Sequence, residues 1–338
     1  MKAVVCTKPQ DLQIVDRPKP TLPPGHALVR IQRVGICGTD FHAFQGNQPY
    51  LTYPRILGHE LSGTIETVDA ANPRALEPDD RVAIIPYLHC GQCIACRRGK
   101  PNCCTHLEVL GVHRDGGMQE YLPVPWDHLV KVPDLSLDQA AILEPLSIGA
   151  HAVRRSKVDS GDLVLVIGAG PIGLAVMAFA HHRGARVITM DIDERRLAFA
   201  QSWCPLEAVV HAEDRPEDRL AAITQGDYPT AVFDATGNIQ SMRRSLYYVA
   251  HGGTLVFVGL SQDAIQMPDP EFHKREVTLM GSRNATLEDF ATVRQAILDQ
   301  SVSTHSYITA TVPLGEIIHE FQGLVDGQTH MIKTLITL

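Results

Sequence analysis

A run of closely spaced cysteines between residues 90 and 104 constrains this chain more than any other segment. It reads Cys-Gly-Gln-Cys-Ile-Ala-Cys-Arg-Arg-Gly-Lys-Pro-Asn-Cys-Cys, and thiols at spacings of three, three and eight residues can close around one tetrahedral metal. Thiolate is a soft ligand, and four thiolates with no open position are typical of a structural zinc site. The run therefore predicts a lobe of the protein that is held by zinc.

The composition predicts a folded protein with room for two domains. The chain has 338 residues, of which 44% are hydrophobic and 20% charged, as in ordinary globular proteins. The formal charge of -8 argues against a nucleic-acid partner, because phosphate contacts need an excess of Lys and Arg. We also expect no membrane partner and a cytoplasmic location, since the first residues alternate like a strand and no uncharged apolar run reaches transmembrane length. In that compartment cysteines stay reduced, which disfavours disulfides in the cluster.

The hydrophobic pattern changes near residue 150. Before it, short β-like runs broken by Pro and Gly predict twisted antiparallel strands. After it, continuous apolar runs alternate with helical stretches, which is typical of βαβ units with a buried parallel sheet. The expected elements are strands at 163–167, 186–191, 231–234 and 254–259, and helices at 171–182, 241–249 and 287–300. We expect a β-rich domain of residues 1–150 and 285–338, with its zinc lobe near 88–105, and a doubly wound domain of residues 151–284.

A glycine-rich turn joins the first expected strand of the second domain to the helix that follows. It reads Gly168-Ala-Gly170-Pro171-Ile172-Gly173, and Asp191 ends the next strand. The glycines let the backbone approach a pyrophosphate, and the helix N-terminus offers oriented N–H groups. A carboxylate such as Asp191 would bind ribose hydroxyls and repel a 2′-phosphate, which favours NAD over NADP. Arg195 and Arg196 could instead serve such a phosphate, and a tight turn without a ligand is the plainer alternative.

Three further segments hold candidate metal ligands. They are Gly-Ile-Cys37-Gly-Thr39-Asp40-Phe-His42, then Gly-His59-Glu60, and finally Leu-Glu144-Pro at the junction of the two patterns. Taken singly, each residue has a plain explanation: a buried thiol, a core histidine or a surface charge. Together with a zinc lobe and a nucleotide turn, they predict a catalytic metal site.

In this order, the motifs resemble those of the zinc-dependent medium-chain dehydrogenase/reductase family over essentially the whole chain. The resemblance implies an α/β protein with a GroES-like catalytic domain and a Rossmann domain, and it implies NAD and two zinc ions per chain. The catalytic zinc would be bound by Cys37, His59, Glu60 and Glu144, and the structural zinc by Cys90, Cys93, Cys96 and Cys104. Glu144 stands where alcohol dehydrogenases of the family have a cysteine. A carboxylate at this position is a pattern of the polyol and threonine dehydrogenases. Whether Glu60 and Glu144 bind the metal directly is left open.

The resemblance also implies roles around the metal. A zinc with an open position lowers the pKa of a substrate hydroxyl. Thr39 and His42 would relay the released proton to solvent, and Asp40 would orient His59. Thr236, Val258 and Gly259 join the glycine turn and Asp191 as cofactor-binding candidates. The family commonly pairs Rossmann sheets edge to edge, here through the strand ending near Gly259, so a homodimer or homotetramer is expected.

Several segments resemble bacterial dehydrogenases of hexonates such as L-gulonate or L-galactonate, among them Gly46-Asn47-Gln-Pro-Tyr and Gly281-Ser-Arg283-Asn. We expect oxidation of a secondary hydroxyl of such a sugar acid. Its carboxylate needs a cation, for which Arg114 and Arg283 are candidates, and Asn47 could bind a hydroxyl. The alternatives are a sorbitol, xylitol or threonine dehydrogenase, a sensor that binds NAD without chemistry, and a zinc-free quinone reductase.

Overall fold

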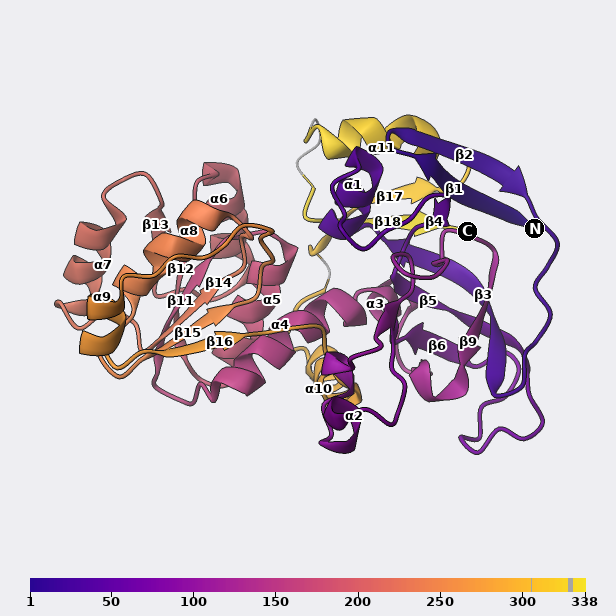
Figure 1. Cartoon of the computed structure of the whole chain (residues 1–338), viewed down its shortest axis with the longest axis horizontal. Coiled ribbons are helices and arrows are strands. Elements are labelled where there is room, and N and C mark those ends of the chain that lie inside the picture. The colour runs from indigo at the N-terminus through magenta and orange to yellow at the C-terminus, as the bar shows by residue number, and fades with distance from the viewer. Residues whose placement is uncertain (305, 328–330) are drawn as a thin grey trace. The chain divides into compact units, whose positions relative to one another are not determined.

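The computed structural model describes residues 1–304, 306–327 and 331–338. These residues form two compact units, Met1–Glu144 with Thr304–Leu338, and Pro145–Ser303. The first unit therefore contains both ends of the chain, coloured indigo and yellow in Figure 1. No helix among the described residues has the length and apolar character needed to span a lipid bilayer.

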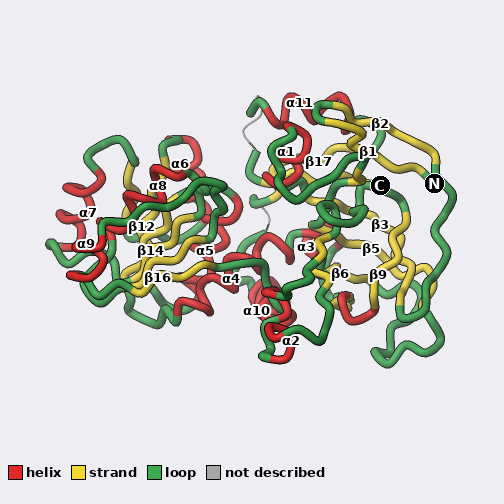
Figure 2. Tube along the Cα trace, in the orientation of Figure 1, coloured by secondary structure: helices red, strands yellow, loops and turns green. Residues whose placement is uncertain are grey.

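The first unit is built on β-strands, as the alternating runs predicted. Its main sheet is seven-stranded with the order β10-β6-β5-β3-β18-β17, and β9 also pairs with β3. Every pairing in this sheet is antiparallel except that of β17 with β18. A three-stranded sheet β2-β1-β4 and the pair β7-β8 complete the sheets of this unit. In Figure 2 the first unit contains more strand, in yellow, than helix, in red.

The bounds of the elements in the first unit are as follows. The strands are β1 (Lys2–Lys8), β2 (Asp11–Asp16), β3 (His26–Gly35), β4 (Arg55–Ile56), β5 (Glu60–Val68), β6 (Arg81–Ile84), β7 (Tyr87–Leu88), β8 (Glu108–Val109), β9 (Tyr121–Pro125), β10 (Leu129–Lys131), β17 (Ile308–Pro313) and β18 (Lys333–Thr337). The helices are α1 (Gly38–Gln45), α2 (Ile94–Arg97), α3 (Leu137–Ala141) and α11 (Ile317–Val325), with short 3₁₀ turns at Pro101–Cys103 and Trp126–His128.

The second unit is a parallel sheet flanked by helices. Its strand order is β13-β12-β11-β14-β15-β16, and all of its pairings are parallel. The strands are β11 (Leu163–Ile167), β12 (Arg186–Asp191), β13 (Ala208–His211), β14 (Ala231–Asp234), β15 (Thr254–Phe257) and β16 (Thr278–Gly281). The helices are α5 (Pro171–His182), α6 (Glu194–Trp203), α7 (Pro216–Thr224), α8 (Ile239–Arg244), α9 (Asp269–Lys274) and α10 (Leu287–Leu298), and α4 (Leu143–Ser156) begins at the boundary.

The strand order of this sheet creates a topological switch point. From β11 the chain first builds β12 and β13 on one side and then returns to build β14, β15 and β16 on the other. In open parallel sheets, ligands bind outside the carboxyl ends of the strands at such a reversal. Here the reversal lies between β11 and β14.

Some of the expected boundaries differ from the structure, and two helices show why. Helix α10, expected in the first domain, belongs to the second unit because its Asp289 bonds to His151 and Arg154 of α4. The expected helix 241–249 begins earlier, since Asn238 caps α8, and it ends as a 3₁₀ turn at Ser245–Tyr248.

The expected pairing edge near Gly259 is wrong. Strand β15 lies between β14 and β16, so its backbone groups are already used on both sides. The edge strand on that side of the sheet is β16, and 43% of the surface of its Leu279 is exposed.

Candidate active site

The four cysteines of the zinc lobe converge. The Cys104 Sγ lies 3.5 Å from that of Cys90 and 3.8 Å from that of Cys93, and the Sγ atoms of Cys93 and Cys96 are 3.5 Å apart. Thiolates bound about 2.3 Å from a tetrahedral zinc lie about 3.8 Å from one another, so this arrangement fits the ion. The fifth cysteine of the run, Cys103, is exposed and outside the group.

A second group of ligands lies in the first unit at the start of α1 and of β5. Ligand atoms of Cys37, His59 and Glu60 all lie within 4.8 Å of one another. Cys37 is the N-cap residue of α1, and His59 and Glu60 lead into β5 with only 6% and 0% of their surface exposed. The Glu60 Oε2 accepts no hydrogen bond among the described residues. Buried polar atoms normally have partners, so this oxygen fits metal coordination.

Glu60 is fixed by two neighbours that the motifs did not reveal. The Lys333 Nζ on β18 donates to the Glu60 Oε1 at 2.6 Å and to the Ile36 backbone carbonyl at 2.9 Å. Burial alone would lower the pKa of Lys333, but the Glu60 carboxylate raises it above its usual value. A Cβ atom on Gly35 would lie 2.0 Å from the Glu60 Oε2, so only glycine leaves room for this carboxylate. The free oxygen of Glu60 is thereby held in one place.

Glu144, the carboxylate in the first turn of α4, has a different partner. The Tyr87 hydroxyl on β7 donates a hydrogen bond to the Glu144 Oε1, and both residues are buried. Burial raises the pKa of Glu144 to about 7. Tyr307, fully buried just before β17, also has its pKa raised well above normal, first by burial and then by the charges of Glu60 and Cys37. Glu144 therefore lies in the same polar environment as the ligand group.

Helix α1 places the remaining expected residues beside Cys37. The buried Asp40 accepts hydrogen bonds from the backbone N–H of Cys37 (2.9 Å) and of Gly58 (3.1 Å). Its Oδ1 is 3.8 Å from the His59 Nδ1, an ion-pair distance rather than a hydrogen bond. Thr39 is half-buried and His42 is exposed on the same helix. Asp40 thus fixes the backbone at both ligand-bearing turns.

The glycine turn has the backbone that a dinucleotide site requires. Gly168 has φ 97°, and a Cβ on Gly173 would lie 1.7 Å from the Gly168 carbonyl oxygen. Gly170 caps α5, Pro171 and Ile172 open the helix, and no atom lies within 4 Å of a Cβ built on Gly170. The turn is therefore tight inside and open on the side of Gly170.

Residues at the ends of neighbouring strands surround this turn. Thr236 follows β14 and donates to the buried Asp234, and a Cβ on Gly168 would lie 3.1 Å from its Cγ2 atom. Val258 and Gly259 follow β15, and a Cβ on Gly259 would lie 2.2 Å from the Gly237 nitrogen. The predicted cofactor residues thus gather at the switch point.

Asp191 and Asp193 form an acidic turn after β12. The Asp191 Oδ2 accepts from the Ala169 N–H at 2.6 Å and its Oδ1 from the Asp193 N–H at 2.9 Å. Asp193 caps α6 and holds Arg195 through two side-chain contacts of 3.1 and 3.0 Å. The hydrogen bonds from Arg195 hold the pKa of Asp193 well below its usual range. Arg195 is therefore already paired with a carboxylate.

The expected substrate residues are exposed and lie in different units. Asn47 and Arg114 belong to the first unit, where Arg114 lies 3.7 Å from Glu108, and Arg283 belongs to the second. The exposed Tyr50 stacks on His113 with ring centroids 5.9 Å apart. Their meeting around one substrate stays a prediction.

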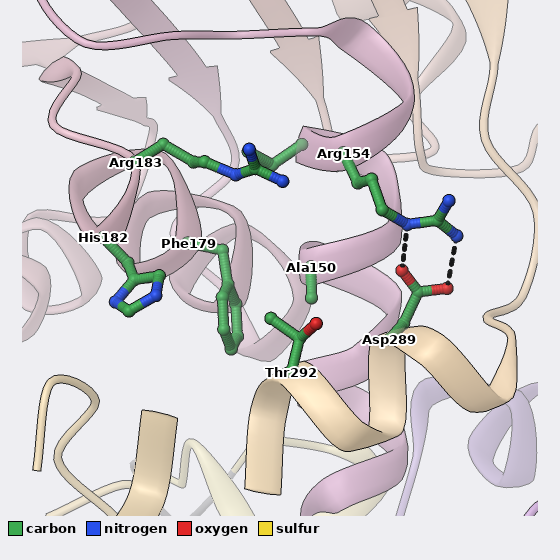
Figure 3. A pocket seen from close by; sticks show the side chains of 8 residues that line it. Ala150, Arg154, Phe179, His182, Arg183, Asp289 and Thr292 are labelled. Atoms are coloured by element: carbon green, nitrogen blue, oxygen red, sulfur yellow. Dashed lines mark hydrogen bonds and ion pairs between the residues drawn. The ribbon is translucent and has the colours of Figure 1, made fainter. Parts of the chain in front are cut away.

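A small pocket in the second unit lies between α4, α5 and α10 (Figure 3). Asp289 is 1% exposed and accepts from His151 at 2.9 Å and from Arg154 at 2.7 and 3.0 Å. The backbone N–H and hydroxyl of Thr286 also donate to it, each at 2.8 Å. This network joins α4 to α10 and is a packing feature of the fold.

Four residues around the site have contacts that the motifs did not predict: Lys333, Tyr87, Tyr307 and Gly35. Gly35 opens the Gly-Ile-Cys37 motif, but its spacing says nothing of the room it leaves for Glu60, and Lys333 is 273 residues from its partner Glu60. The one available signal was Lys333 itself, a charge within the apolar strand pattern of the C-terminus. Such a charge inside a strand pattern indicates a buried partner.

The chain matches known protein families along most of its length. Residues 23–134 match the alcohol dehydrogenase GroES-like domain, and residues 171–299 match the zinc-binding dehydrogenase family. The L-galactonate-5-dehydrogenase of Escherichia coli K12 is 40% identical over 337 residues, which cover 100% of this chain and 99% of the relative.

Two solved structures share the whole fold. The alcohol dehydrogenase RspB of Escherichia coli CFT073, complexed with NADH, is 30% identical with a TM-score of 0.93 and covers 100% of this chain and 99% of its own. A zinc-binding dehydrogenase of Sinorhizobium meliloti bound to NADP is 26% identical with a TM-score of 0.90, again covering 100% and 99%. The expected combination of a GroES-like and a Rossmann domain is thereby confirmed.

Proposed function

Because the chain belongs to the zinc-dependent medium-chain dehydrogenase/reductase family, we propose that it oxidises a secondary hydroxyl of a hexonate to a ketone, with NAD as hydride acceptor. The observation that carries the proposal is the 40% identity with an L-galactonate-5-dehydrogenase along the full chain. L-Gulonate and L-galactonate are the first substrates to test.

The residues present fit a catalytic zinc ion. Cys37, His59 and Glu60 would hold it, and the buried Glu60 Oε2 lacks a hydrogen bond among the described residues. When bound, zinc supplies a Lewis acid that polarises a substrate oxygen. A carboxylate in place of a second thiolate makes the ligand set harder, which suits an oxygen-rich substrate. Cys90, Cys93, Cys96 and Cys104 would hold a second, structural zinc.

The other roles fall to residues near the ligands. Thr39 takes the proton of the substrate hydroxyl and His42, which is exposed on the same helix, passes it to solvent. Asp40 keeps the turns of Cys37 and His59 in register through its two backbone hydrogen bonds. Arg114 and Arg283 are the cations proposed for the substrate carboxylate, and Asn47 binds a hydroxyl.

NAD is proposed over NADP because two carboxylates follow β12. Asp191 lies at the strand end beside the glycine turn, and Asp193 already neutralises Arg195. A 2′-phosphate would therefore meet negative charge, and Arg195 would already be paired with Asp193. Glycines 168, 170 and 173 leave the backbone open to the pyrophosphate, beside Thr236, Val258 and Gly259.

We further propose that the protein is a homo-oligomer in which the free edge of β16 pairs with a second copy. An edge strand with an exposed leucine is a template for such pairing. Light scattering should give a dimer or larger species for the wild type and a smaller species for Leu279→Lys.

The test of the activity is the initial rate of NAD and NADP reduction on hexonates, hexitols and threonine. We expect activity on at least one hexonate with NAD. Activity on hexitols with none on hexonates would contradict the substrate, and a preference for NADP would contradict the cofactor. Metal analysis should give two zinc ions per chain, whereas one zinc with no turnover would favour a sensor.

A further inference from the structure

The hydrogen bond from Tyr87 to Glu144 distinguishes the two glutamates of the metal site. Tyr87 is 4% exposed and Glu144 is 5% exposed, so the bond is shielded from water. A buried carboxylate needs donors, and the Tyr87 phenol donates to the Glu144 Oε1. The hydrogen-bond partner of each carboxylate therefore indicates whether that carboxylate has an oxygen available to bind a metal.

Glu60 shows the opposite arrangement. Lys333 occupies its Oε1, while its Oε2 has no hydrogen bond among the described residues. Within the described part of the chain, the ligand group around this point consists of Cys37, His59 and Glu60, and Glu144 lies outside it. One carboxylate thus has an oxygen ready to bind a metal, and the other is held by a neutral donor.

Tyr87 is well placed to hold Glu144 because its own backbone is fixed. It pairs with Val109 across β7 and β8, and its carbonyl oxygen is 3.1 Å from the His128 Nε2. Three residues later the chain reaches Cys90 of the zinc lobe. The lobe therefore lies directly after the residue whose hydroxyl contacts Glu144.

We propose that Tyr87 is a positioning residue that keeps Glu144 off the catalytic metal. Cys37, His59 and Glu60 then serve as the three protein ligands, and the fourth position stays open for the substrate. Without the phenol hydroxyl, the Glu144 carboxylate turns toward the metal and closes that position. The inference rests on the proposed function, since it assumes a metal at the group of Cys37.

The test uses the full-length protein with its zinc replaced by Co²⁺, whose visible absorption reports the number and type of ligands. The band of the catalytic site is identified as the one that Cys37→Ser removes. Glu144→Gln should leave this band unchanged, because Glu144 is not a ligand. Tyr87→Phe should change it, and should lower kcat/KM by roughly 10- to 100-fold, as removal of a partner of a metal-site residue typically does.

The double variant separates positioning from a general structural effect. Tyr87→Phe combined with Glu144→Gln should give the band of Glu144→Gln alone, since Tyr87 acts only through Glu144. The control is Tyr53→Phe, which removes a phenol hydroxyl bonded to the Ala43 carbonyl and should leave the band unchanged.

Three results would overturn the proposal: a changed band in Glu144→Gln, an unchanged band in Tyr87→Phe, or a double variant that differs from Glu144→Gln. Should Tyr87→Phe not fold, the result for Glu144→Gln decides the position of Glu144 by itself. A wild-type protein with no band sensitive to Cys37→Ser would contradict the proposed function rather than the role of Tyr87.

Discussion

The Nζ atom of Lys333 lies 2.6 Å from the Oε1 of Glu60, although 273 residues separate the two in the sequence. Both side chains are at most 2% exposed. Lys333 begins β18, which pairs with β3, the strand that leads to Cys37. The last strand of the chain therefore completes the surroundings of a metal ligand near its start.

Replacing Lys333 with methionine should destabilise the first unit strongly. The change leaves the Glu60 carboxylate buried without its partner, and breaking a buried ion pair in this way costs about 3–5 kcal/mol. Urea unfolding of the metal-free protein measures the loss. Lys19→Met is the control, because Lys19 and its partner Glu66 are partly exposed and the change should cost far less. Equal losses in the two variants would contradict the importance of burial.

Gly35→Ala should lower the metal content at the catalytic site. The added Cβ would lie 2.0 Å from the Glu60 Oε2, so this oxygen must move away from Cys37 and His59. Disturbing a metal site in this way typically lowers its affinity for the metal by about 10–100-fold. After dialysis against a weak chelator we therefore expect about one zinc per chain instead of two. Gly315→Ala, where no atom lies within 4 Å of the new Cβ, should keep both ions.

The two metal sites should fail in different ways. Cys93→Ser removes a ligand of the lobe and should lower the melting temperature, because binding of a structural zinc contributes directly to folding. Cys37→Ser should remove turnover from a protein that melts like the wild type. Cys103→Ser should change neither property, since this thiol is exposed and outside the group. The three variants are compared by calorimetry and by rate; loss of folding in Cys37→Ser would mean that the sites are not separable.

Asp289 should make stability depend on pH. Burial alone would raise the pKa of this carboxyl, but hydrogen bonds from His151 and Arg154 lower it below its usual value. A depressed pKa in the folded state stabilises the protein above the unfolded value, about 3.9, and this contribution is lost as the pH falls through the folded pKa. Asp289→Asn should therefore be destabilising by about 1–3 kcal/mol at pH 7 and by less at pH 3.

Glu288→Gln is the matched control for Asp289, since Glu288 contacts the same arginine but is 66% exposed. Its effect should be below about 1 kcal/mol at pH 7. Urea unfolding at pH 7 and pH 3 checks both variants. A penalty for Asp289→Asn that stays constant between the two pH values would show that the carboxylate charge contributes nothing.

Local patterns predicted the second unit well. Strand β11 and helix α5 begin and end at the expected residues, because an apolar run followed by glycines and then Pro171 determines a strand, a turn and a helix start within a few residues. The unit to which α10 belongs was not predictable in this way. It depends on a contact of Asp289 with His151, which lies in a distant segment. The edge strand required the strand order, which no local pattern contains.

In the candidate site too, local motifs predicted the ligands but not the contacts between distant segments. The spacing of the four lobe cysteines indicated a metal, and the structure brings their sulfur atoms together. Cys37, His59 and Glu60 came from motifs, and they also form one group. Glu144 was expected as a fourth ligand, but its bond to Tyr87 could not be inferred, because neither residue lies near the other in sequence and the contact depends on how β7 enters the core.

The zinc lobe has a consequence for how the protein is made. All four of its thiols lie within residues 90–104, so they leave the ribosome long before Lys333 is synthesised. The surroundings of Glu60 are complete only after Lys333 has been added. The lobe can therefore capture its ion during synthesis before the site around Glu60 is assembled.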